Sequence, residues 1–361
     1  MLVAVGTPVR QDGSFDDRQL VAVGSALSAH LRPGQLVVLK STVPPGSTRG
    51  LLRPLLERSG LVAGVDFGLA FCPERLAEGT AMAELRTLPI VVGGLDAETA
   101  AVAAAFWSRG LGVETVPMDT LEAAEITKLA DNWWIDLNIA LGNELAKFCD
   151  LFGVDVLDVI GAANAIPKGA STVNILRPSV GVGGSCLTKD PWMVWRAARE
   201  RGLDIRTAPT AREVNAGMPA WTARIVREEL AAAGKDVAGA TVAVLGLAFK
   251  NDTGDLRETP TVGVVEELVA DGADVRLHDP LADKLAVKEL FGIKPLPSIE
   301  EAVRDADVVA VLALHREFGD VDLAALPVAR GCRLVDGRAY FDRERIATLR
   351  AQGFGYRGIG R

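Results

Sequence analysis

Short apolar runs alternate with helical patterns at both ends of this chain, whereas the middle carries helical patterns alone. Strands that alternate with helices predict βαβ units and a parallel sheet. In the first part, strands are expected at Met1–Gly6, Gln35–Leu39, Gly68–Phe71 and Ile90–Val92, with helices around Asp17–His30, Thr48–Ser59 and Asp96–Arg109. In the last third, they are expected at Thr241–Leu245, Asp274–Leu277, Asp307–Leu312 and Cys332–Val335. The chain is therefore expected to be an α/β protein.

A long helical pattern begins at Asp119 and stops before Gly153. It predicts a helix of about 30 residues, or about 45 Å. Its polar residues step by three or four and share one face, and they are Glu125, Lys128, Asn132 and Asp136. Asparagine is a mediocre helix former, yet Asn132, Asn138 and Asn143 all lie in this helix, which predicts that they have partners. Further helices, expected at Val154–Ala163, Trp192–Arg201 and Arg212–Ala233, make the middle an all-helical connector.

Residues 178–191 place one cysteine after several glycines and before a carboxylate. Gly181, Gly183 and Gly184 allow close approach of backbone and ligand. Cys186 could therefore lie in a ligand-lined turn, with Asp190 holding a water or a cation near the sulfur. Taken alone, such a cysteine is more often a small buried apolar side chain than a nucleophile.

Length and charge limit the classes of function. A chain of 361 residues is expected to hold two or three domains. The net charge of -8, without a basic stripe, argues against nucleic acid and membrane surfaces as partners. The four cysteines form no CxxC pair and the three histidines lack ligand-like spacing, so no metal site is expected. Reduced thiols and the lack of a secretory signal indicate a cytoplasmic protein.

The turn Gly246-Leu-Ala-Phe-Lys250 follows the first strand of the last third, and Pro260 starts a helix. A strand, a glycine turn and a helix form a phosphate site at the helix N-terminus. Lys250, Arg257 and Arg338 could neutralise a diphosphate there. Many α/β turns carry a glycine and bind nothing, so this turn alone is a weak signal.

Seven motifs in chain order together resemble the nucleotide-sugar 6-dehydrogenases, the family of UDP-glucose and UDP-N-acetylhexosamine dehydrogenases. They are Val5-Gly-Thr7-Pro8 (with Gly6 where the family has proline), Ser41-Thr-Val-Pro-Pro-Gly46, Cys72-Pro-Glu-Arg-Leu-Ala-Glu-Gly79, Glu125-x-x-Lys128-x-x-x-Asn132, Gly183-Gly-Ser-Cys186-Leu-Thr-Lys-Asp190, Gly246-Leu-Ala-Phe-Lys250-x-Asp252 and Asp336-Gly-Arg338. The resemblance covers essentially all of the chain.

The resemblance implies two Rossmann-like parallel-sheet domains joined by a helical connector with a long central helix. The corresponding division is a partial NAD-binding domain over 1–118, a central domain with the nucleophile loop over 119–234, and a UDP-sugar domain over 235–361. The first domain is expected to be truncated, because the chain opens on a strand and no GxGxxG turn is present. A homodimer through the central helix is also implied.

The family reaction is a four-electron oxidation of a sugar C6 alcohol to an acid with two NAD and one water. The resemblance makes Cys186 the nucleophile, which forms a thiohemiacetal and then a thioester. It places Lys128 and Asn132 at the developing alkoxide and at the substrate. Asp190, with Thr42, is implied to orient or deprotonate water. Glu74 is the expected general base of hydrolysis.

Contacts with the cofactor and the substrate also follow from the resemblance. Thr7, Thr42, Glu78 and Arg257 are implied as NAD contacts, and Gly183, Lys250 and Arg338 as substrate contacts. Other interpretations stay open at this point. Thr42 could instead cap the helix after Pro45, and Glu74 and Glu78 could be surface carboxylates.

The identity of the sugar rests on mixed signals. The segments around Asn132–Asn143, Cys72–Arg75 and Asp190–Trp192 resemble the UDP-N-acetylhexosamine branch, which usually has histidine before the nucleophile. Here Ser185 stands there, and Lys189 resembles the UDP-glucose and GDP-mannose branches. UDP-N-acetylmannosamine is the expected substrate, with UDP-glucose as the alternative. A second alternative is a non-catalytic remnant that binds a UDP-sugar as a dimer.

Overall fold

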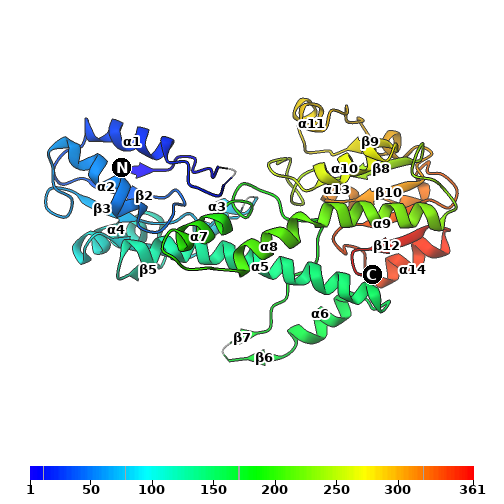
Figure 1. The fold of residues 1–361 in the computed structure, drawn as a ribbon, viewed down its shortest axis with the longest axis horizontal. Coiled ribbons are helices and arrows are strands. Elements are labelled where there is room, and N and C mark those ends of the chain that lie inside the picture. Colours follow the sequence, from blue (N-terminus) through cyan, green and yellow to red (C-terminus); the bar gives the residue numbers. More distant parts are fainter. Residues whose placement is uncertain (11, 78, 170, 320) are drawn as a thin grey trace. The chain divides into compact units, whose positions relative to one another are not determined.

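The computed structural model describes residues 1–361 except 11, 78, 170 and 320. It consists of two compact units, each built around one five-stranded sheet (Figure 1). The first unit comprises Met1–Trp134 and Lys189–Pro209, and the second comprises Ile135–Thr188 and Thr210–Arg361. In the described parts of the chain, no helix is both long and apolar enough to cross a membrane.

The sheet of the first unit has the strand order β1-β2-β3-β4-β5. Its elements are β1 (Leu2–Val3), α1 (Arg18–Ser28), β2 (Leu36–Leu39), the π-helix η1 (Thr48–Leu52), α2 (Arg53–Leu56), the 3-10 helix η2 (Glu57–Ser59), β3 (Gly68–Phe71), α3 (Ala81–Glu84), β4 (Ile90–Gly94), α4 (Ala97–Leu111) and β5 (Thr115–Met118). Both faces of this sheet are buried. On β2, Val37 and Leu39 pack with α1 and α2, while Val38 packs with α4 on the other face.

The expected α/β fold with parallel sheets is confirmed, but one strand pair of this unit departs from it. β1, β2 and β3 are parallel, but β4 runs antiparallel to β3, with Ala70 opposite Gly94. A parallel strand would need a crossover connection that returns from the carboxyl ends of the strands to their amino ends. Between β3 and β4 the only described helix is α3, four residues long, which is too short to make that return.

The long central helix is confirmed as α5, which spans Leu121–Leu151 and has 31 residues. The other elements that follow β5 and precede β8 along the chain are α6 (Val156–Asn164), β6 (Pro167–Lys168), β7 (Ser171–Thr172), α7 (Asp190–Arg199), α8 (Thr207–Ala216) and α9 (Met218–Ala232). The single helix expected over Arg212–Ala233 is in fact two, because Pro219 lies in the first turn of α9 and cannot continue α8. The two-residue strands β6 and β7 form an unexpected hairpin within this helical region.

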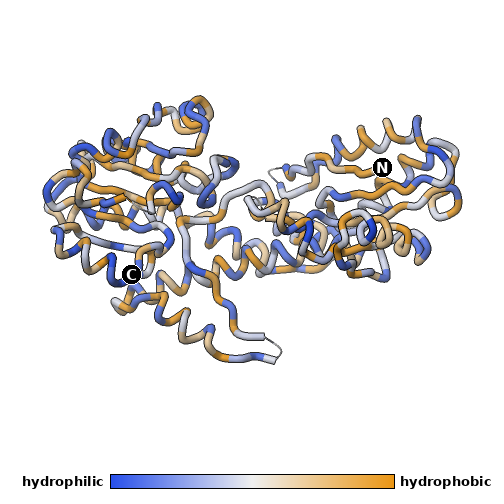
Figure 2. The backbone as a smooth tube through the Cα atoms, turned by 180° about the vertical axis from the view of Figure 1, so that it is seen from behind, coloured by the Kyte–Doolittle hydropathy of each residue, from blue (hydrophilic) through white to orange (hydrophobic). Residues whose placement is uncertain are grey.

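The second sheet is parallel throughout and has the order β12-β11-β10-β8-β9. Its elements are β8 (Thr241–Leu245), α10 (Thr261–Ala270), β9 (Asp274–His278), α11 (Lys284–Phe291), α12 (Ile299–Val303), β10 (Val308–Val311), α13 (Arg316–Gly319), the 3-10 helix η3 (Leu323–Ala325), β11 (Arg333–Asp336), α14 (Arg343–Ala351) and β12 (Gly355–Gly358). Figure 2 shows hydrophobic residues along these strands. The strand order reverses between β8 and β10, where doubly wound sheets bind ligands beyond the carboxyl ends of the strands.

Candidate functional site

The carboxyl edge of β1, β2 and β3 carries three candidate residues of the first unit. Thr7 follows β1, Thr42 follows β2 and Glu74 follows β3. Ser41 joins the first two loops, since its Oγ accepts from the amide of Val5 at 2.7 Å and donates to the Val5 carbonyl at 2.8 Å. The hydroxyls of Thr7 and Thr42 have no hydrogen-bond partner among the described residues. Two threonine donors at this edge are therefore available to a ligand.

Glu74 lies in a segment that is fixed to α5. Its carboxylate accepts from the amide of Leu76, and the neighbouring Arg75 donates to Asp131 of α5 at 2.7 Å. This ion pair brings the segment to the turn of α5 that also carries Lys128 and Asn132. Glu74 is half-buried, not a surface carboxylate. Glu78, the other carboxylate expected here, lies outside the described residues.

Glu125, the first residue of the polar face of α5, has a structural role. Its carboxylate accepts from the amides of Gly46 at 2.5 Å and Thr48 at 2.8 Å, and from the Thr48 hydroxyl at 2.6 Å. It therefore caps the helical segment that begins at Thr48, so the interpretation of Thr42 as that cap is wrong. Burial raises the pKa of Glu125 above its usual range, and the hydrogen bonds from Thr48 and Gly46 oppose the rise.

Lys128 and Asn132 lie one turn apart on α5, and both side chains are buried. Asn132 donates through Nδ2 to Oδ2 of Asp190, while Lys189 donates to Oδ1 of the same carboxylate. Lys128 is only 5% exposed, yet it has no hydrogen bond or ion pair with any described residue. Its side chain is thus largely enclosed by protein while its ammonium stays available to a ligand, unlike that of a solvated helix lysine.

Lys189 is a site residue that the motif analysis did not select. It forms an ion pair with the buried Asp190 at 2.5 Å. The available signal was its place directly before an acidic residue in the nucleophile loop. In the family resemblance, Lys189 served only to distinguish the UDP-glucose and GDP-mannose branches from the UDP-N-acetylhexosamine branch.

The glycine turn before Cys186 packs against the turn after β8, within the second unit. A Cβ on Gly183 would lie 2.5 Å from the Cβ of Phe249 and 2.6 Å from the carbonyl oxygen of Glu258. Gly184 has φ +81° and donates its amide to the carbonyl of Arg257 at 3.0 Å. The expected close approach at Gly183 is thus an approach of two protein loops.

Gly183→Ala is expected to lower the free energy of unfolding by about 1–3 kcal/mol and to reduce activity about ten-fold or more, because the added methyl group displaces the cysteine turn. Thermal unfolding and steady-state kinetics measure both effects. Gly161→Ala is the matched control, since a Cβ at Gly161 in α6 has no heavy atom within 4 Å. It should leave activity unchanged and stabilise the helix slightly. A Gly183→Ala protein with parent stability would contradict the packing argument.

Cys186 is exposed, whereas the other three cysteines are buried. Burial raises the pKa of Cys72 to about 11 and that of Cys332 to about 12, and it also raises the pKa of Cys149. Only thiolates are good nucleophiles. Among the four thiols, Cys186 is therefore the one accessible to a reagent or substrate near neutral pH.

The turn after β8 lies at the reversal point of the second sheet. Gly246 has φ +79°, and a Cβ there would lie 2.0 Å from the carbonyl oxygen of Ala313, so the loops after β8 and β10 touch. Arg338 donates to the carbonyl of Phe249, which brings it to the same turn as the half-buried Lys250. The expected phosphate-binding pair thus lies at the ligand-binding edge.

A buried acid–histidine pair supports this turn. Asp279 accepts from the amide of Leu247 at 2.7 Å and is 3.0 Å from Nε2 of His315, whose Nδ1 accepts from the amide of Asp252. His315 therefore carries its proton on Nε2. Burial acts to raise the pKa of Asp279, but the hydrogen bond from His315 and those from the backbone amides hold it below its usual range. Neither residue was selected from the sequence.

Arg257, expected to contact NAD, lies in the second unit and forms an ion pair with Asp255. The other expected NAD contacts lie in the first unit. A role for Arg257 with NAD stays a prediction. Its backbone carbonyl accepts from Gly184, so its segment supports the cysteine turn.

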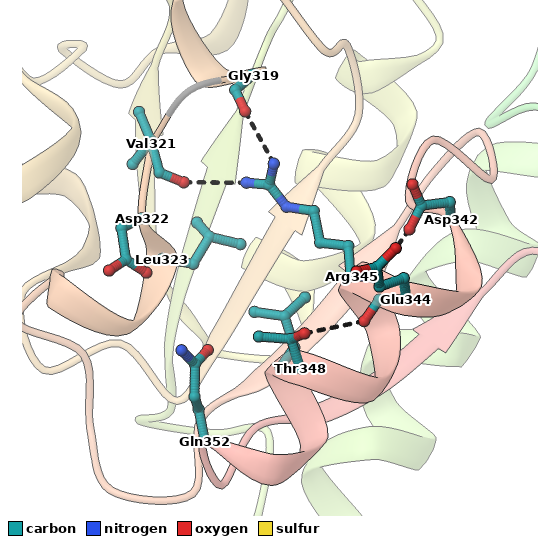
Figure 3. A pocket seen from close by; sticks show the side chains of 10 residues that line it. Gly319, Val321, Asp322, Leu323, Asp342, Glu344, Arg345, Thr348 and Gln352 are labelled. Atoms are coloured by element: carbon teal, nitrogen blue, oxygen red, sulfur yellow. Dashed lines mark hydrogen bonds between the residues drawn. The ribbon is translucent and has the colours of Figure 1, made fainter.

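A hollow of about 490 Å³ opens beside α14, and no candidate residue lines it (Figure 3). Arg345 crosses it and donates to the carbonyls of Gly319 at 2.8 Å and Val321 at 3.0 Å. Its guanidinium therefore ties α14 to the chain after α13. Because that arginine serves the fold, the hollow is assigned no ligand.

The asparagines of α5 confirm the prediction that they have partners. Asn138 accepts from the amide of Leu176 at 2.8 Å, and Asn143 accepts from the amide of Ser179 at 2.7 Å. Both hold the strand-like segment that leads into the cysteine turn. The last polar residue of the face, Asp136, pairs with Arg212, a partner that the sequence did not reveal.

Three family models match this chain, all from the UDP-glucose/GDP-mannose dehydrogenase family. The NAD binding domain matches residues 1–109, the central domain 122–217, and the UDP binding domain 243–343. The first match shows that residues 1–109 belong to an NAD-binding domain, and it gives no support to the expectation of a truncated one, which rested on the missing GxGxxG turn. It also weighs against a non-catalytic remnant.

Relatives and solved structures agree with these matches. UDP-N-acetyl-D-mannosamine dehydrogenase of Pyrococcus horikoshii is 33% identical over 364 residues, covering 100% of this chain and 80% of the relative. A UDP-D-ManNAc dehydrogenase structure from that organism has a TM-score of 0.87 at 32% identity, with 100% and 80% coverage. An NDP-N-acetyl-D-galactosaminuronic acid dehydrogenase from Methanosarcina mazei Go1 has a TM-score of 0.85 at 33% identity, with 100% and 77% coverage.

Proposed function

The chain belongs to the UDP-glucose/GDP-mannose dehydrogenase family, and we propose that it oxidises the C6 hydroxyl of UDP-N-acetyl-D-mannosamine to the acid. Membership makes it an NAD-dependent UDP-sugar dehydrogenase, an oxidoreductase with an NAD-binding and a UDP-binding domain. The substrate follows the names of the relatives. The alternative is UDP-glucose, as in a UDP-glucose dehydrogenase structure from Pyrobaculum islandicum with a TM-score of 0.84 at 30% identity, covering 99% of this chain and 79% of that one.

The observation that carries this proposal is Lys128, a largely buried residue whose ammonium has no partner in the described protein. Such an ammonium suits an anionic or strongly polar ligand. An alkoxide that develops during oxidation of a carbonyl adduct is such a ligand. Asn132, one turn away, supplies a second donor on the same helix face.

Cys186 forms the covalent intermediate in this mechanism. Its thiolate attacks the C6 aldehyde, so a C–S bond forms and the carbonyl oxygen becomes an alkoxide that accepts from Lys128 and Asn132. Loss of a hydride from this carbon then gives the thioester. The exposed position of Cys186 supports the role, since the other thiols are buried.

Water releases the acid from the thioester. Its oxygen attacks the carbonyl carbon, the C–S bond breaks, and the thiolate of Cys186 leaves. Glu74 takes the proton of this water, and Asp190 orients the water with Thr42. Asn132 and Lys189 each donate to one oxygen of the Asp190 carboxylate and so fix its position.

The cofactor site uses the edge of the first sheet. The hydroxyls of Thr7 and Thr42, without partners in the described chain, fit hydrogen bonds to NAD. When bound, NAD accepts the two hydrides, one molecule for each oxidation. Lys250 and Arg338 hold the diphosphate of the UDP-sugar at the turn after β8, and Gly183 lies beside that turn.

The substrate proposal predicts that two NADH form per molecule of UDP-N-acetyl-D-mannosamine. UDP-N-acetyl-D-mannosamine, UDP-N-acetylglucosamine and UDP-glucose are assayed side by side by NADH absorbance and product mass. The highest kcat/KM is expected for the first. A higher value for UDP-glucose would establish the alternative, and one NADH per sugar would contradict the four-electron reaction.

We also propose a homodimer through α5. Three large apolar side chains, Trp134, Leu141 and Phe148, are spaced seven residues apart and are about half exposed. This spacing forms a stripe of the kind that pairs helices. The three-domain division at 118/119 and 234/235 stays a proposal as well, supported by three family matches that each fall within one part.

Leu141→Glu combined with Phe148→Glu is expected to yield a monomer, because charges in an apolar stripe oppose pairing. Light scattering after size-exclusion chromatography gives the mass of each species. Val102→Glu is the matched control, since Val102 is a similarly exposed apolar residue on α4. An unaltered dimer in the double variant would exclude this interface.

A further inference from the structure

We propose that Asp136, Arg212, Asn143 and Asn215 are positioning residues that hold both ends of loop 179–187 and thereby orient the thiol of Cys186. The inference rests on the proposed role of Cys186 as nucleophile. All four side chains are buried, and all belong to the second unit. Asp136 and Asn143 lie on α5, and Arg212 and Asn215 lie on α8 beside it (Figure 1).

Asp136 is the centre of this cluster. Its Oδ1 accepts from Nη1 of Arg212 at 2.6 Å and from Nδ2 of Asn215 at 2.8 Å. Its backbone carbonyl also accepts from Asn215 at 3.0 Å. Its Oδ2 is buried and has no partner in the described protein. Burial raises the pKa of Asp136, and the Arg212 charge opposes the rise.

The cluster holds the start of the loop through the asparagines. Asn143 donates to Oδ1 of Asn215 at 2.9 Å and accepts from the amide of Ser179 at 2.7 Å. Ser179 in turn donates its hydroxyl to the carbonyl of Gly181 at 2.8 Å. A continuous hydrogen-bonded path therefore joins Asp136 to the first residues of the loop.

The cluster reaches the other end of the loop through Arg212. The Nη1 that pairs with Asp136 also lies 3.4 Å from the carbonyl oxygen of Leu187, the residue after Cys186. Between the two ends, Gly183 packs on Phe249 and Gly184 donates to Arg257. Cys186 thus lies in loop 179–187, whose two ends are both hydrogen-bonded to residues that pair with the buried Asp136 carboxylate or are linked to it. A small displacement of a reacting group costs a large part of the rate.

The cluster is a poor device for stability alone. A buried ion pair is often no more stabilising than apolar residues of the same shape, because both charges lose water. Here an unpartnered carboxylate oxygen adds to that cost. The hydrogen bonds of the ion pair do fix the orientations of the Arg212 and Asn215 side chains, which an apolar contact cannot do.

The test measures the thiol directly, apart from turnover. The rate constant for alkylation of Cys186 by iodoacetamide is followed by mass spectrometry from pH 6 to 10, together with kcat and the KM for NAD. Asp136→Asn is expected to change the alkylation rate or its pH midpoint by about three-fold or more and to lower kcat about ten-fold or more, with KM for NAD nearly unchanged. The double variant Asp136→Asn with Arg212→Gln restores part of kcat, since two amides can pair.

Glu229→Gln is the matched control. Glu229 is a mostly buried carboxylate on α9 that pairs with Arg333 of β11, away from the loop. It should lower stability about as much as Asp136→Asn but leave the alkylation profile of Cys186 unaltered. A parent-like profile in Asp136→Asn overturns the proposal, whatever its stability. If that variant does not fold, Asn143→Ala takes its place, and the same change of about three-fold or more in the alkylation of Cys186 is expected of it.

The two proposals fail differently. If Cys186→Ser still forms the acid, the nucleophile assignment is wrong, yet alkylation still reports whether the cluster orients the thiol. If Cys186 is essential and alkylation ignores the cluster, only the positioning role is wrong.

Discussion

Cys186→Ser is expected to form no acid and to lower kcat for the full oxidation by about four orders of magnitude or more. A serine hydroxyl is a weak nucleophile without an activating base, and an alkoxide is a poorer leaving group than a thiolate. NADH yield and product mass measure the loss. The first oxidation does not use the sulfur, so a small amount of NADH and of aldehyde remains consistent with the mechanism.

Chemical labelling provides the control for this variant. Because burial raises the pKa values of Cys72, Cys149 and Cys332, iodoacetamide near pH 8 should add one carbamidomethyl group to the native protein, at Cys186. Cys149→Ala should retain activity and still take up one label. Acid formation at the parent rate by Cys186→Ser, or by fully labelled protein, would exclude the thioester route.

Lys128→Met is expected to reduce kcat about 100- to 1,000-fold, because it removes one donor to the developing alkoxide. The melting temperature should stay unchanged or rise. The Lys128 ammonium forms no ion pair in the described protein that the variant would lose, and methionine fills a similar volume in this largely buried position. Opposite effects on activity and stability distinguish a ligand-binding lysine from a structural one.

Lys147→Met is the matched control on the same helix. Lys147 lies over the ring of Trp221, with 5.3 Å from Nζ to the ring centroid, and no role in the reaction is assigned to it. Its replacement should leave kcat nearly unaltered. Lys128→Met with parent activity, or with a large loss of stability and no loss of activity, would remove Lys128 from the mechanism.

The inner strands of both five-stranded sheets were predicted from the sequence, as were the edge strands β1 and β9. β8 agrees with its expected range residue for residue, because its last four side chains alternate between two hydrophobic cores. β5 and β12 were not predicted, and both are edge strands. Pro117 in β5, and the glycines at both ends of β12, weaken the strand signal that a propensity argument can detect.

The residues of the candidate site were predictable where a motif carries them, and their individual roles were not. Glu125 and Asp136 have the same spacing on α5 as Lys128 and Asn132, yet Glu125 caps a helix and Asp136 pairs with Arg212. Helix periodicity places side chains on one face but does not identify what lies opposite. Arg212 is 76 residues from Asp136 in sequence, a separation at which no local pattern reports a contact.

The reversed direction of β4 leaves the first sheet with one connection of unconstrained length. β3 ends, and β4 begins, at the same edge, so residues 72–89 start and finish there without crossing the sheet. The β1–β2 connection, by contrast, must run back past the sheet, and α1 fixes its span. Changes of length after Glu74 and Arg75, which the ion pair with Asp131 holds at α5, therefore leave strand register unaltered. For protein engineering, residues 79–89 are the part of the first sheet's connections that can be lengthened or shortened.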